Sequence, residues 1–202
     1  MINTEETYLK FLLRTIKKPS SADATENSLY GYLSISLIAF FIALTSGRIT
    51  AQLVENMSIF TTISPFISGL LTFFKIILFL GALLMADIVL TYGIIVIMYK
   101  RKVDFNQFVT RFMGLFSFAV PVAVVIGLLG FVFGLAMVNV IGYLLVSIFI
   151  GYLTAFNYLL IQTKQGNGVD FIYVLLTSNL VYLIGISSLL KSVFAPLIGS
   201  FF

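Results

Sequence analysis

The sequence has no cysteine and no histidine, and each absence excludes a class of chemistry. Without cysteine the chain forms no disulfide, thiolate nucleophile, zinc finger or iron–sulfur cluster. Without histidine it lacks the usual general base and the commonest metal ligand. Only eight aspartate and glutamate residues occur, mostly outside the apolar stretches, which disfavours a carboxylate metal cage. We therefore predict no catalytic residue, no metal, no cofactor and no enzymatic activity.

Charge is also scarce: charged residues make up 10% of the 202 residues, whereas hydrophobic residues make up 60%. Soluble domains carry about 25% charged and roughly 45–50% apolar residues. The mean hydropathy is +1.10, and several apolar runs exceed the ~18 residues that mark a bilayer span. The sequence therefore predicts an all-α fold, an integral membrane helical bundle.

Five apolar runs are predicted to be transmembrane helices: residues 29–46, 76–99, 112–134, 139–162 and 171–190. The third and fourth come from one uncharged block, which as a helix would be about 75 Å long, more than twice the ~30 Å hydrocarbon core. The chain must therefore turn back, and residues 134–139 are the predicted turn. Pro121 is expected to kink the third span. Residues 59–74 are left open as a re-entrant or interfacial helix.

The 12 lysine and arginine residues are distributed unevenly between the segments that flank these spans. With the N-terminus inside, the cytoplasmic segments hold Lys10, Arg14, Lys17, Lys18, Lys100, Arg101, Lys102, Arg111 and Lys164. The opposite side holds only Arg48, Lys75 and Lys191. This bias predicts a cytoplasmic N-terminus and an outside C-terminus. The positions of the charges explain the net charge of +4 better than nucleic-acid binding does. Separately, the abundance of Ile, Phe, Lys and Asn favours a bacterial plasma membrane.

Residues 1–27 are predicted to form a cytoplasmic unit in front of the bundle, which covers residues 28–202. Tyr8, Leu12 and Ile16 recur at helical spacing among basic residues, and Pro19 ends the run. This pattern predicts a basic amphipathic helix. The helix either lies on anionic lipid, where each basic residue is worth about 1 kcal/mol, or packs on the protein's own loops or on a partner.

Asp87 lies near the middle of the predicted span 76–99, where a carboxylate costs roughly 2.5–3.5 kcal/mol. Thr91 lies one helical turn further on, and Asn179 falls near the middle of the last span. These three residues are the candidate intramembrane polar cluster. It is interpreted either as a substrate or proton site or as a hydrogen-bonded clasp between helices.

Two stretches resemble the Yip family of small polytopic membrane proteins. Ser28-Leu29-Tyr30-Gly31-Tyr32-Leu33 is similar to that family's D-L-Y-G-P-L sequence, with Ser28 and Tyr32 in place of Asp and Pro. Phe105 to Arg111, followed by Gly114 and Pro121, resembles the stretch that leads into a glycine and a mid-span proline. The resemblance covers about residues 4–190. It implies five spans with a cytoplasmic N-terminus, and for bacterial relatives it implies no known activity.

The leading functional hypothesis is a membrane adaptor or organiser that meets anionic lipid or a protein partner through its basic cytoplasmic face. Either a protein partner or a homo-oligomer is expected. The residues assigned to this face are Lys10, Arg14, Lys17, Lys18, Lys100, Arg101, Lys102 and Arg111. The alternative is a small transporter or channel-like subunit with Asp87 on the pathway. A membrane enzyme that acts on lipid is disfavoured because the chain has few side chains that could act as a catalytic acid or base.

Overall fold

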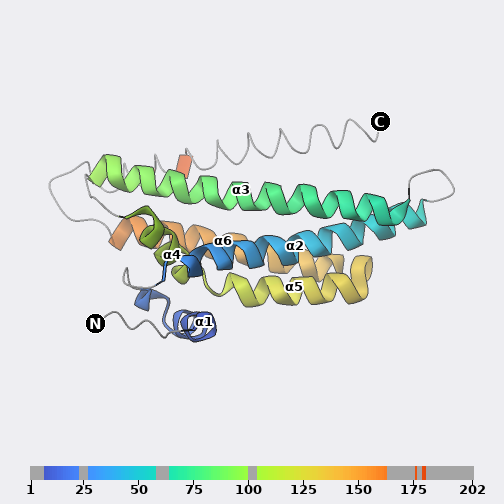
Figure 1. Cartoon of the computed structure of the whole chain (residues 1–202), viewed down its shortest axis with the longest axis horizontal. Helices are drawn as coiled ribbons and strands as arrows, with labels where there is room; N and C mark the ends of the chain where they lie inside the picture. Colours follow the sequence, from blue (N-terminus) through green and yellow to red (C-terminus); the bar gives the residue numbers. More distant parts are fainter. Residues whose placement is uncertain are drawn as a thin grey trace.

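The computed structural model describes residues 7–22, 27–57, 64–99, 104–162, 176 and 179–180. These residues form helices and no strand (Figure 1). The elements are α1 (Tyr8–Lys17), η1 (Pro19–Ser21), α2 (Leu29–Asn56), α3 (Pro65–Tyr99), α4 (Phe105–Leu115), α5 (Ala119–Phe133), η2 (Gly134–Met137) and α6 (Val138–Gln162). The predicted span at residues 171–190 lies almost wholly outside the described residues.

Three helical segments of the described chain are long and apolar enough to cross a membrane. They are Leu29–Asn56, Pro65–Ile97 and Ala119–Ile161, the last comprising α5, η2 and α6. By length and composition these segments identify an integral membrane protein.

The first two helices are longer than the apolar runs that predicted them. The predicted span 29–46 is part of α2, which continues through Arg48 to Asn56 and has 28 residues. The predicted span 76–99 is part of α3, which begins at Pro65 and has 35 residues, about 52 Å. Residues 65–74 are therefore the first turns of α3 and not a separate re-entrant or interfacial helix. Proline suits this start because the first helical position has no hydrogen bond to lose.

The extra turns of α2 and α3 pack against each other at a pair of glycines. A Cβ atom at Gly47 would lie 2.7 Å from the carbonyl oxygen of Gly69, and the reverse distance is also 2.7 Å. Only hydrogen fits at both positions, so the two backbones approach closely. This contact sets the antiparallel register of α2 and α3, which lie side by side in Figure 1.

The predicted third span, residues 112–134, is two helices instead of one. Residues up to Leu115 belong to α4, and α5 begins at Ala119. Pro121 is the third residue of α5, and the kink predicted there is wrong. In the first turn a proline costs no internal hydrogen bond, because the N–H groups there have no partner within the helix. The break in the helix lies before the proline.

The helices α5 and α6 form the predicted hairpin, and η2 lies within the predicted turn segment. Gly134 has φ +53°, a backbone conformation that side chains disfavour. The Leu135 N–H donates to Oε1 of Gln52 at 2.8 Å, so α2 holds the turn. In the same interface between α2 and α5, the Thr45 hydroxyl donates to the Ile126 carbonyl at 3.0 Å. Side-chain bonds between helices thus fix α5 against α2.

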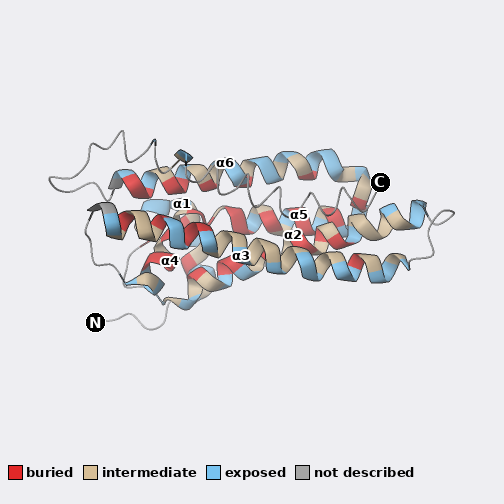
Figure 2. Cartoon of the chain, turned by 90° about the horizontal axis from the view of Figure 1, so that it is seen from above, coloured by how far each residue is buried: buried red, intermediate tan, exposed pale blue. Residues whose placement is uncertain are grey.

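The core is centred on α4, which lies among the other helices at one end of the bundle (Figure 2). Asp104 caps this helix, since its Oδ1 accepts the Gln107 N–H at 3.0 Å. Phe112, Met113 and Phe116 are fully buried. The outer face of α6 is exposed along most of its length, as expected of a surface that faces lipid.

Candidate functional site

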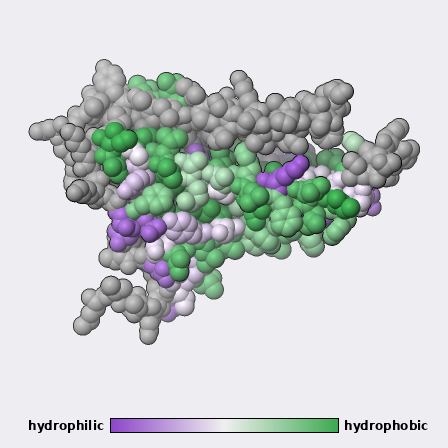
Figure 3. Space-filling model, turned by 45° about the horizontal axis from the view of Figure 1, so that its top comes forward, coloured by the Kyte–Doolittle hydropathy of each residue, from purple (hydrophilic) through white to green (hydrophobic). Residues whose placement is uncertain are grey.

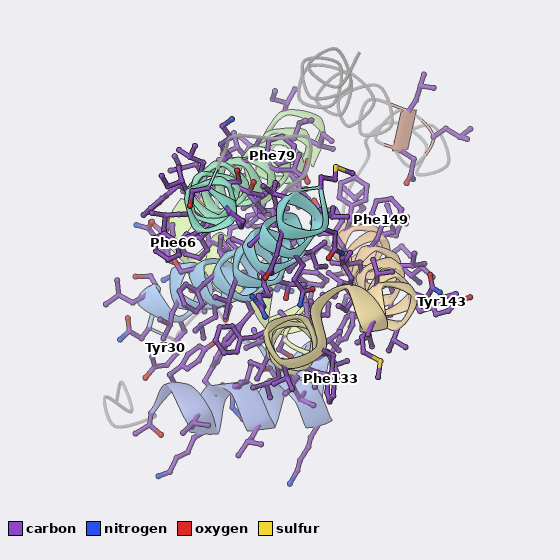
Figure 4. The ribbon with its side chains drawn as sticks, turned by 90° about the vertical axis from the view of Figure 1, so that its right-hand side faces the viewer. Tyr30, Phe66, Phe79, Phe133, Tyr143 and Phe149 are labelled. Carbon is purple, nitrogen blue, oxygen red and sulfur yellow. The ribbon has the colours of Figure 1, made fainter. Side chains whose placement is uncertain are left out.

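The helix α1 lies across the bundle, close to the start of α2. It is seen end-on in Figure 1 and from the side in Figure 4, where the long helices are seen end-on. Phe11 and Thr15 face the protein and are completely buried. Phe11 packs on Tyr30 of α2 with ring centroids 5.2 Å apart, and a Cβ at Gly114 of α4 would lie 3.5 Å from Thr15 and 3.6 Å from Phe11. One side of α1 is therefore seated on α2 and α4.

A hydrogen bond also holds α1 on α2. The hydroxyl groups of Tyr8 and Ser34 lie 3.0 Å apart, and Ser34 also donates to the Tyr30 carbonyl at 3.0 Å. Burial raises the pKa of the Tyr8 phenol, although the bond to Ser34 acts in the opposite direction. Tyr8 therefore stays uncharged at physiological pH.

The side of α1 turned away from α2 and α4 carries two kinds of residue. Leu9 and Leu13 are 66% and 56% exposed. Lys10 and Lys17 are exposed beside them, and Arg14 donates to Ser21. A depression on this surface is lined by Lys10, Leu13, Arg14, Lys17, Lys18 and Ser21. We call Leu9, Lys10, Leu13, Arg14, Lys17 and Lys18 the α1 outer face.

The two stretches that carry the family resemblance touch each other where α2 meets α4. A Cβ at Gly31 would lie 2.8 Å from the backbone nitrogen of Thr110, so the helices meet backbone to backbone. The Thr110 hydroxyl donates to the Ser28 carbonyl at 3.0 Å. Tyr32 donates to Asn106 Oδ1 at 2.7 Å. Residues 74 positions or more apart are thus joined next to the seat of α1.

A continuous series of aromatic rings joins α3 to α6 through α4. Tyr92 of α3 lies 5.5 Å from Phe108, which lies 6.5 Å from Phe112. Phe112 and Phe116 lie 5.4 and 5.6 Å from Tyr152 of α6. Edge-to-face and tilted ring pairs of this kind stabilise a core beyond their buried area. The helix α4 therefore fixes the ends of α3 and α6 as well as α1.

Asp87 is 6% exposed and lies at the same end of the bundle. It follows Gly69 by 18 residues, and Leu29 precedes Gly47 by 18 residues. Because Gly47 and Gly69 are in register, Asp87 lies near the level of Leu29, about 27 Å from the glycine pair. Asp87 is therefore level with the start of α2 and not with its middle.

The predicted polar cluster forms only in part. The Thr91 hydroxyl donates to the backbone carbonyl of Asp87 at 2.8 Å, and no described side chain donates to the Asp87 carboxylate. Asn179 instead donates to Asn157 Oδ1 of α6 at 3.2 Å. The structure thus shows an Asp87–Thr91 pair and an Asn157–Asn179 pair with no hydrogen bond between them.

All the described basic residues of the predicted cytoplasmic face gather at the α4 end. Lys10, Arg14, Lys17 and Lys18 belong to α1 and its end, and Arg111 is on α4. Lys100, Arg101 and Lys102 lie outside the described residues. Hydrophilic residues collect at this end in Figure 3, while hydrophobic residues cover the middle of the visible face.

The residues that position this site were only partly foreseen. The sequence indicated the helix of residues 8–17, but not that Thr110 and Asn106 would hold the start of α2. Asp104, which caps α4 ahead of its amphipathic turns, was the available signal for a separate helix there. Contacts between distant segments leave no comparable local signal.

No protein-family model matches this chain, and neither a curated protein nor a solved structure is significantly similar to it.

Proposed function

We propose that this protein is a non-enzymatic, multi-pass membrane organiser that uses the α1 outer face to meet anionic lipid headgroups and a protein partner. The observation that carries the proposal is that, among the described residues, the contacts of α1 with α2 and α4 come from one side of the helix. Its other side presents apolar and basic residues together at the level where α2 begins. An interfacial amphipathic helix has this combination of surfaces.

In this arrangement α1 can pack on the protein and lie on anionic lipid at the same time. Phe11 and Thr15 account for packing on the protein, whereas Leu9 and Leu13 can enter the boundary between headgroups and acyl chains. Lysines next to such leucines would lie among the headgroups, each contributing about 1 kcal/mol on an anionic surface. We infer that α1 is the amphipathic helix expected from the sequence, fixed parallel to the membrane by α2 and α4.

The membrane topology belongs to the same proposal. We propose five spans with the N-terminus in the cytoplasm of a bacterium, the fifth span being residues 171–190. The described cations support this orientation, because α1 and α4 carry five of them at one end whereas Arg48 and Lys75 lie away from it. Membership of the Yip family stays a prediction.

Purification from native membranes tests the partner. Tagged protein in mild detergent would be compared with a variant that carries Lys10→Gln, Arg14→Gln, Lys17→Gln and Lys18→Gln. The control variant carries Lys75→Gln, which changes a cation outside the α1 outer face. We expect a stoichiometric partner with the wild type and the control but not with the fourfold variant. Equal recovery from all three would contradict the assignment of the contact to α1.

Asp87 supports a second candidate function, a transporter or channel-like subunit. A buried carboxylate without a described donor is a functional-site hypothesis in a membrane protein. The test is Asp87→Asn in proteoliposomes, with Thr91→Val as the control for the neighbouring backbone bond. Loss of a pH-dependent flux in the Asp87 variant alone would favour transport. Absence of any flux in the wild type would leave the organiser as the assigned function.

A further inference from the structure

A groove with apolar walls lies between α2, α3 and α5, at the end of the bundle opposite α1. Its floor is the close contact of Gly47 and Gly69, where neither helix has a side chain to fill the space. Phenyl rings form its walls, among them Phe40 and Phe73 with centroids 5.8 Å apart. Arg48 is the only residue of the lining that is not apolar.

Arg48 lies about the thickness of a hydrocarbon core away from the start of α2. It follows Leu29 by 19 residues, about 28 Å along α2, which is close to the ~30 Å thickness of the hydrocarbon core. With the start of α2 at one membrane surface, Arg48 is therefore near the other. Its side chain is exposed, and no described carboxylate forms a salt bridge with it. The groove extends from this cation inward to Phe40, two helical turns deeper.

We propose that this groove binds an acyl chain of an anionic phospholipid whose headgroup phosphate pairs with Arg48. The apolar walls match an acyl chain in both chemistry and depth. The guanidinium provides several donors in a plane that suits a phosphate. A negatively charged headgroup is therefore retained beside the cation, while a zwitterionic lipid gains less. This inference does not rest on the function proposed for α1, because the two surfaces lie at opposite ends of the bundle.

The absence of tryptophan from the chain gives a direct test. Phe73→Trp places a single reporter in the groove, and Tyr143→Trp places one on the exposed outer face of α6 (Figure 4). Each full-length variant is reconstituted in vesicles that contain brominated phosphatidylglycerol or brominated phosphatidylcholine. The bromine atoms quench a tryptophan that they touch. We expect about fivefold tighter association of phosphatidylglycerol at the groove reporter, and no preference at the α6 reporter.

The cation is tested in the same assay. Arg48→Gln in the groove-reporter background should remove the preference, whereas Lys75→Gln should leave it unchanged. Leu70→Trp, in the same lining, serves as a second reporter if Phe73→Trp does not reconstitute. Equal quenching by both lipids, or a preference that survives Arg48→Gln, would overturn the proposal. Weak quenching of the groove reporter by both lipids, with strong quenching of the α6 reporter, would overturn it too. A second protein copy would then cover the groove.

Discussion

The two ends of the bundle are built in different ways. Around α4 the interior is closed by aromatic rings and by hydrogen bonds between distant segments, such as that of Tyr32 with Asn106. At the opposite end α2 and α3 meet at two glycines and leave a groove beside them. The α4 end therefore combines close backbone approach with a filled aromatic interior, whereas the other end has close backbone approach beside an open groove. This difference agrees with the two proposals, a surface presented by α1 at the first end and a lipid site at the second.

Truncating a buried ring at the α4 end should have the largest effect on stability. Phe112→Ala removes a fully buried ring that contacts both Phe108 and Tyr152, and we expect a loss of about 3–5 kcal/mol. Phe131→Ala is the control at the other end, where the ring is exposed. Unfolding in mixed detergent micelles measures both. Similar losses for the two variants would show that the ends do not differ in packing.

The contact between Gly31 and Thr110 should come next. Gly31→Ala puts a methyl group 2.8 Å from the backbone nitrogen of Thr110, which forces α2 and α4 apart and costs about 1–3 kcal/mol. Gly81→Ala in α3 is the matched control, since nothing lies within 4 Å of its added Cβ. There the better helix propensity of alanine should stabilise by about 0.5–1 kcal/mol. Effects of the same sign in both variants would contradict the close approach at Gly31.

The smallest effect is expected for the hydrogen bond that joins α2 to α5 between the two ends. Thr45→Val keeps the shape of the side chain but removes the bond from its hydroxyl to the Ile126 carbonyl. In membranes such bonds are worth roughly 0.6 kcal/mol. Thr154→Val is the control, because its hydroxyl bonds only within its own helix, to Ile150. The unfolding free energies of the two single variants are compared. Equal losses would show that the bond between α2 and α5 makes no contribution of its own.

The sequence by itself determined the features that depend on local composition. Hydropathy identified a helical membrane protein, and Pro19 with the spacing of Tyr8, Leu12 and Ile16 identified the helix α1. The uncharged block of residues 112–162 was too long for one span, and the helix does break at Gly134. In each case the property that decides the structure lies within a few turns of one helix.

Only the tertiary structure decided where the helices end and which residues meet. A helix continues through a charged residue such as Arg48 when its backbone packs closely on a neighbour, and hydropathy contains no record of that neighbour. The same register places Asp87 level with Leu29. The bond of Asn179 to Asn157 likewise joins residues that no local pattern pairs. Contacts between segments far apart in the chain depend on register and helix crossing, which local periodicity does not specify.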